Sequence, residues 1–91
     1  MTDRQLPTID HDFDGDHEEY FKMLARMMRG AHRRVVDSDP TDLAHLIALR
    51  DYLDDIVTSA GSGIHERFSW GEMAAELGVS RQAVAKAYGA K

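Results

Sequence analysis

Apolar residues recur at helical spacing in the first long ordered segment of the chain. They are Tyr20, Leu24, Met27, Met28, Ala31 and Val35. This spacing places them on one face and predicts a helix over residues 17–36. Asp16 followed three residues later by Glu19 is typical of a capping box, so we expect Asp16 to cap the start of this helix.

A second apolar stripe begins after an aspartate-rich turn. Asp39 is a suitable N-cap, and Pro40 fits the first helical position because its missing N–H would have no helical partner there. The apolar residues are Leu43, Leu46, Ile47, Leu53, Ile56, Val57, Ala60 and Ile64. Gly61 and Gly63 indicate either a kink or a break. Because the stripe stays in phase as far as Phe68, we favour one long helix, kinked or frayed near Gly61.

Two short helices are predicted in the last third of the chain. Ser69 is followed three residues later by glutamate, the spacing of a capping box, so a helix should open at Trp70. Gly78 accepts the left-handed backbone that ends a helix, and Ser80 then caps a second helix over Arg81–Tyr88. The residues expected to face inward are Met73, Ala74, Leu77, Val79, Val84 and Ala87.

These patterns predict an all-α fold: two long antiparallel helices followed by a C-terminal helix-turn-helix. Residues 1–15 are expected to form an acidic flexible tail, because they mix Pro, Gly, Asp and Thr without apolar periodicity. Residues 16–68 would form a two-helix support and dimerisation region, and residues 69–91 the helix-turn-helix, within one compact domain. A chain of 91 residues buries only roughly 60–65% of its unfolded surface, so a partner subunit would add stability.

Composition excludes several classes of function. The chain has no cysteine, which excludes disulfides, cysteine-type zinc fingers and thiol nucleophiles. No apolar run approaches the roughly 20 residues that cross a bilayer, and no signal peptide is visible, so we expect a cytoplasmic protein without membrane contact. No nucleophile motif and no glycine-rich phosphate loop is present, so we expect neither an enzyme nor a cofactor.

The methionines at 23, 27, 28 and 73 are interpreted as core filling.

A calcium loop is the main alternative interpretation of the acidic tail. Asp10, Asp12, Asp14 and Gly15 match the opening of an EF-hand loop. The twelfth loop position requires glutamate, but Phe21 occupies it. We therefore predict no metal site here.

Charge is distributed unevenly along the chain. The net charge is −5, which argues against binding DNA by bulk electrostatics. Residues 1–61 contain seven Lys or Arg and thirteen Asp or Glu, whereas residues 62–91 contain four and three. The acidic excess therefore lies in the predicted tail together with the predicted support region. The first helix of the support region also has a basic stripe, made of Lys22, Arg26, Arg29 and Arg33. This stripe is suited either to a second DNA contact or to solvated charge pairing.

The run SWGEMAAELGVSRQAVAKAYG resembles the helix-turn-helix of small bacterial and phage DNA-binding regulators. The likeness is closest to those with a Trp-initiated first helix and an LGVSRQAV turn, and it covers about a quarter of the chain. It implies that the second helix enters the major groove. Transferred residue by residue, the positions that face DNA are Ser80, Arg81, Gln82, Ala85 and Lys86. The positions suited to phosphates are Arg67, Ser69, Trp70, Lys86 and Lys91.

The chemistry of these residues agrees with that implication. Arginine can bridge O6 and N7 of guanine, and glutamine can bridge N6 and N7 of adenine. We therefore predict sequence-specific binding of double-stranded DNA by a homodimeric transcriptional regulator. The alternative is a protein-interaction module that docks onto a transcription or DNA-processing complex, which the acidic net charge favours.

Overall fold

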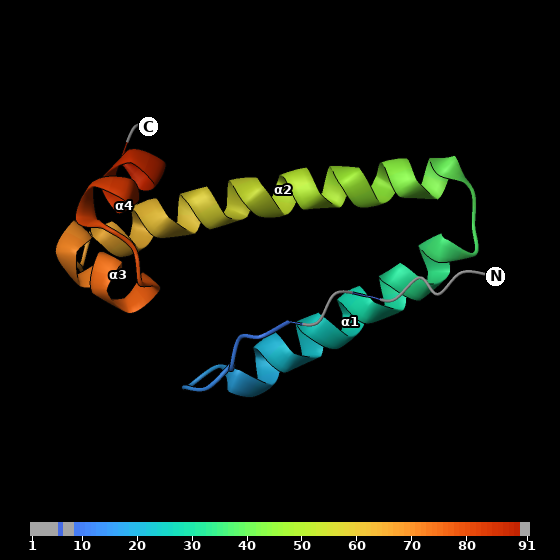
Figure 1. Cartoon of the computed structure of the whole chain (residues 1–91), viewed down its shortest axis with the longest axis horizontal. Helices are drawn as coiled ribbons and strands as arrows, with labels where there is room; N and C mark the ends of the chain where they lie inside the picture. The colour runs from blue at the N-terminus through green and yellow to red at the C-terminus, as the bar shows by residue number, and fades with distance from the viewer. Residues whose placement is uncertain (1–5, 7–8, 90–91) are drawn as a thin grey trace. The chain divides into compact units, whose positions relative to one another are not determined.

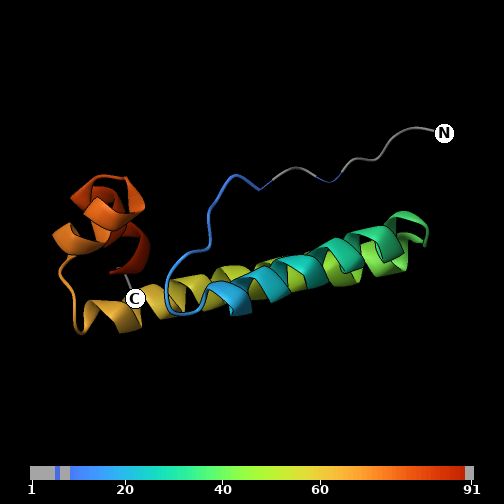
Figure 2. The same cartoon turned by 90° about the horizontal axis from the view of Figure 1, so that it is seen from below.

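The computed structural model describes Leu6 and residues 9–89, which contain helices and no strands (Figures 1 and 2). The helices are α1 (Glu18–Val36), α2 (Pro40–His65), α3 (Trp70–Leu77) and α4 (Arg81–Tyr88). The all-α prediction is confirmed. Two compact units meet within α2, between Ile47 and Ala48, so the last turns of α2 belong with α3 and α4. Of these helices, none is both long enough and apolar enough to cross a membrane.

The start of α1 differs from the prediction. Its N-cap is His17, which makes no side-chain cap hydrogen bond, so the expected cap at Asp16 is wrong. The first turn is stabilised instead by an i,i+4 ion pair, in which Nζ of Lys22 donates to the Glu18 carboxylate at 2.8 Å. This hydrogen bond and the carboxylate charge raise the pKa of Lys22.

The start of α2 follows the prediction, and its end does not. Oδ1 of Asp39 accepts hydrogen bonds from the backbone N–H groups of Thr41 at 2.9 Å and Asp42 at 3.3 Å, which satisfies two donors of the first turn. The helix continues through both glycines, so the prediction of one long helix is confirmed. It ends at His65 rather than at Phe68.

The core of the described residues lies between α3 and α4. Val84 is 1% exposed and is buried together with Met73 and Ala74. Trp70 and Tyr88 pack against this group. The small side chain of Ala74 allows close contact between the two helices, and the prediction that Met73, Ala74 and Val84 face inward is confirmed.

Three other positions that were expected to face inward are exposed. Leu77 is 53% exposed, Val79 is 50% exposed, and Ala87 is exposed. A helix of two turns presents only a narrow strip to one neighbour, and in α3 this strip is occupied by the buried residues Met73 and Ala74. The prediction for these three positions is therefore wrong.

The methionine prediction holds only in the C-terminal unit. Met73 is buried, whereas Met23, Met27 and Met28 are 39%, 63% and 58% exposed. No residue of α1 is buried. On the apolar face of α1, Tyr20, Met27 and Met28 are exposed, whereas Leu24, Ala31 and Val35 are half-buried.

The end of α2 contacts α4 directly. The Oγ atom of Ser62 donates a hydrogen bond to the Tyr88 carbonyl at 2.7 Å. Gly61 is buried, and a Cβ atom there would overlap the ring of Tyr88. A Cβ atom at Gly63 would meet nothing within 4 Å. Gly61 is therefore required by the close approach of Tyr88 rather than by a break in the helix.

Alanine at these two glycines is expected to have opposite effects on stability. Gly63→Ala should raise the free energy of unfolding by up to about 1 kcal/mol, because alanine is the better helix former. Gly61→Ala should lower it by about 1–3 kcal/mol, because the added methyl displaces the Tyr88 ring. Urea denaturation followed by circular dichroism measures both. Equal stabilisation by the two variants would contradict the contact between α2 and α4.

Candidate nucleic-acid interface

The start of α3 is fixed by a capping box. Oγ of Ser69 accepts a hydrogen bond from the backbone N–H of Glu72 at 3.0 Å, and the Glu72 carboxylate accepts one from the backbone N–H of Ser69 at 2.8 Å. The Trp70 ring stacks on His65 of α2, with ring centroids 3.3 Å apart. The predicted capping box is confirmed, and the stack orients α3 relative to the end of α2.

The turn between α3 and α4 depends on the backbone conformation of Gly78. Its φ is 72° and its ψ is 29°, in the left-handed region, and its N–H donates to the Ala74 carbonyl at 2.9 Å. Nothing lies within 4 Å of an added Cβ atom, so the requirement for glycine comes from φ rather than from space. Ser80 then caps α4, its Oγ accepting from the backbone N–H of Ala83 at 3.0 Å. Both features were predicted from the sequence.

The outer face of α4 presents polar side chains to solvent. Arg81, Gln82 and Lys86 are exposed. Within the part of the chain that the structure describes, these three side chains make no hydrogen bond or ion pair. Ser80 is also exposed, although its Oγ caps the helix, and Ala85 is half-buried rather than fully outward. Three of the predicted DNA-facing side chains are therefore free to contact a ligand.

The predicted phosphate contacts are more scattered. Arg67 is exposed in the turn before α3, with its guanidinium 5.3 Å from the centroid of the Phe68 ring. Ser69 is exposed, whereas Trp70 is half-buried in its stack and has mainly a packing role. Lys91 lies outside the described residues.

The two short helices differ in the charge of their exposed side chains. On α3 these side chains include the carboxylates of Glu72 and Glu76, whereas on α4 they include the cations Arg81 and Lys86. Carboxylates repel a phosphate backbone, and cations attract it. The outer face of α4 is therefore the part of this unit suited to contact nucleic acid.

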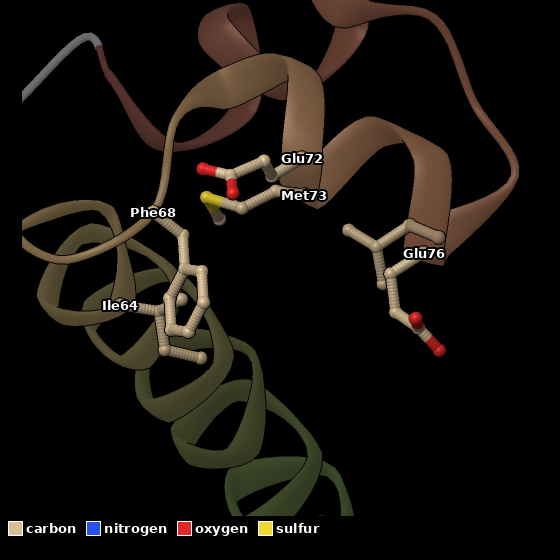
Figure 3. Close-up of a pocket in the computed structure, with 6 residues that line it drawn as sticks. Ile64, Phe68, Glu72, Met73 and Glu76 are labelled. Atoms are coloured by element: carbon tan, nitrogen blue, oxygen red, sulfur yellow. The ribbon is translucent and has the colours of Figure 1, made fainter.

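An open apolar groove beside α3 was not predicted from the sequence. It has a volume of about 420 Å³. Figure 3 shows Ile64 and Phe68 from the end of α2 and the following turn opposite Met73 of α3. The full lining is Ile64, Phe68, Glu72, Met73, Glu76 and Leu77. The groove was missed because Leu77 was expected in the core and Phe68 within α2.

No group of three His, Asp or Glu side chains among the described residues is placed to hold a metal ion. Comparison of the chain with protein-family models, with curated proteins and with solved structures finds no match.

Proposed function

We propose that the chain binds double-stranded DNA sequence-specifically through α4 and acts as a transcriptional regulator. The observation that supports this most strongly is the geometry of the C-terminal unit. Two short capped helices pack around Val84 and are joined by the left-handed Gly78. Their outer face exposes Arg81, Gln82 and Lys86 without partners among the described residues. In a helix-turn-helix, this face of the second helix enters the major groove.

The exposed residues divide between contacts to bases and contacts to phosphates. Arg81 and Gln82 lie in the first turn of α4, the part of a recognition helix that approaches base edges. Each bidentate contact to guanine or adenine contributes about 1–3 kcal/mol of discrimination. Lys86, Arg67 and the N-terminus of α3 would contact phosphates, which fix the register of the protein without specifying sequence.

Lys86→Ala is expected to weaken binding almost equally for all duplexes. If Lys86 of each copy neutralises one phosphate, the slope of log affinity of the dimer against log salt concentration should fall by about 0.9 per copy. Arg50→Ala is the matched control, because Arg50 is exposed on α2 and pairs with Asp51 at 3.3 Å. Salt titration by fluorescence anisotropy measures the slope. An unchanged slope in Lys86→Ala would show that Lys86 does not contact a phosphate.

The proposed functional unit is a homodimer formed through residues 16–68, with α1 and α2 antiparallel in each copy. The exposed face of α4 contains only two cations, Arg81 and Lys86, so one copy alone would bind weakly. A dimer would place two α4 helices about 34–36 Å apart, one turn of DNA, and so would prefer a palindromic site. The exposed apolar residues of α1 support this assembly.

Selection of bound fragments from random duplex DNA tests the proposed function. An enriched, palindromic sequence is the expected result. If no sequence is enriched, and binding at low salt is no tighter than to an arbitrary duplex, the regulator proposal fails. A protein partner in a transcription or DNA-processing complex would then be the function to test.

A further inference from the structure

The basic stripe of α1 is a continuous row of cations on one side of the helix. Lys22, Arg26, Arg29 and Arg33 follow one another at intervals of four, three and four residues, so they fall within about 60° around the helix axis. The row extends over about 17 Å along that axis. All four residues belong to the same helix, so their alignment follows from the geometry of α1 alone.

Three cations of the stripe form no ion pair with the described residues of their own unit. Lys22 pairs with Glu18 at 2.8 Å. Arg26, Arg29 and Arg33 are exposed, and among the described residues of the unit that contains α1 none forms an ion pair or a side-chain hydrogen bond with them. These three guanidinium groups are therefore available to a ligand of opposite charge.

The stability of α1 does not account for this row. Like charges three or four residues apart on a helix repel each other and destabilise it, and the stripe contains three such pairs in succession. No aspartate or glutamate occurs between Glu19 and Asp37, so no acidic residue along the row of arginines offsets the repulsion. A bound polyanion would offset it, because it neutralises the arginines.

The position of the stripe on α1 favours a phosphate backbone over a membrane or a protein partner. Leu24 and Ala31, at the centre of the apolar face, lie about 180° around the helix from the stripe. A helix that inserted this face into a membrane would point its cations away from the lipid headgroups. No apolar side chain falls within the 60° of the stripe, whereas the centre of a protein interface is largely apolar. Contact with phosphates requires only exposed cations.

We propose that the basic stripe is a second DNA-binding surface, which contacts the phosphates of double-stranded DNA independently of base sequence. The inference rests on the proposed function for the identity of its ligand, and it adds contacts that α4 does not make. A duplex has about ten phosphates over about 17 Å of its axis, enough on one side for each of the three free arginines. The exposed face of α4 contains only Arg81 and Lys86 as cations, so the stripe would be the larger source of attraction to phosphates.

Two double variants with the same net charge test the stripe. Arg26→Gln with Arg29→Gln, the stripe variant, removes two cations from the stripe. Arg34→Gln with Arg50→Gln, the matched control, removes two exposed arginines outside it. Arg34 follows Arg33 directly, so it lies about 100° further around α1 and away from the stripe. Glutamine has nearly the same helix propensity as arginine. Anisotropy of an arbitrary labelled duplex, titrated with the full chain over a series of salt concentrations, measures affinity and its slope.

The stripe variant should bind the arbitrary duplex at least about tenfold more weakly at low salt. Its slope of log affinity against log salt concentration should fall by about 1.8 per copy, because two phosphate contacts are lost. Affinity for a selected sequence should fall by the same factor, since phosphate contacts do not specify bases. The control should stay within about threefold of the wild type and keep its slope.

Three results would overturn the proposal. The first is an unchanged slope in the stripe variant, and the second is an equal fall in the stripe variant and the control, which would reflect net charge alone. The third is unchanged DNA binding together with loss of binding to vesicles of phosphatidylserine and phosphatidylcholine, which would assign the stripe to a membrane. Circular dichroism should show wild-type helical content and a thermal midpoint at least as high, because a repulsion is removed.

The stripe and the proposed function can fail separately. If selection from random duplexes enriches no sequence while the stripe variant loses its slope, the regulator proposal fails and the stripe remains a non-specific DNA contact. If a sequence is enriched while the slope of the stripe variant is unchanged, the regulator proposal stands and the stripe is not a DNA contact.

Discussion

Val84→Asp is expected to unfold the C-terminal unit that contains α3 and α4. Val84 is 1% exposed and packs with Met73, Ala74, Trp70 and Tyr88. None of these side chains offers a charged partner, and an unpaired buried carboxylate costs several kcal/mol. Small domains have a total stability of only about 5–15 kcal/mol. Thermal denaturation followed by circular dichroism should show loss of the cooperative transition or a large fall in its midpoint.

Val79→Asp is the matched control for this substitution. Val79 has the same side chain and lies five residues earlier, but it is 50% exposed in the turn between α3 and α4. A surface substitution of this kind usually changes stability by no more than about 0.5 kcal/mol. Equal destabilisation at both positions would mean that the two helices do not pack as described.

Arg81→Ala is expected to have the largest effect on recognition of a selected DNA sequence. Loss of a bidentate contact to guanine costs about 1–3 kcal/mol, which is roughly a 5- to 150-fold loss of affinity for each half-site at fixed salt. Binding to an arbitrary duplex should weaken less, because only one phosphate-attracting charge is removed. Anisotropy titrations against the selected and the arbitrary duplex measure both losses.

Two further variants distinguish a contact of Arg81 with bases from attraction of its charge to phosphates. Arg81→Lys keeps the cation but not the planar fork that binds two guanine acceptors, so it should keep non-specific affinity and lose most of the preference at the base that Arg81 contacts. Arg50→Ala removes an arginine from the exposed surface of α2 and should leave both affinities unchanged. If Arg81→Ala weakened all duplexes equally, Arg81 would contact phosphate instead of bases.

The features predicted correctly from the sequence depend on neighbouring residues. The caps at Asp39, Ser69 and Ser80 each satisfy backbone donors two or three residues away. The left-handed turn at Gly78 is likewise a property of one residue. Such interactions are determined by short stretches of sequence, which is why the α3–turn–α4 unit and its exposed Arg81 were predictable.

The features that were missed depend on contacts between distant parts of the chain. Periodicity gives the phase of a helix but not the width of surface that its neighbour covers, so Leu77 and Val79 were placed inside although both are exposed. The long helix was predicted to be kinked or frayed near Gly61, and the contact of Gly61 with Tyr88, far along the chain, was not predicted. The groove could not be predicted from the sequence, because it forms between the end of α2 and one side of α3, and the sequence does not give the relative position of these two elements.

Parallel selection of random duplex DNA with the wild type and with Arg81→Ala tests the central claim most directly. If α4 contacts bases, the wild type should enrich one palindromic sequence. The variant should then lose its preference at one position in each half-site and retain the others. Identical preferences for both proteins, or no enrichment with the wild type, would contradict recognition of DNA by α4.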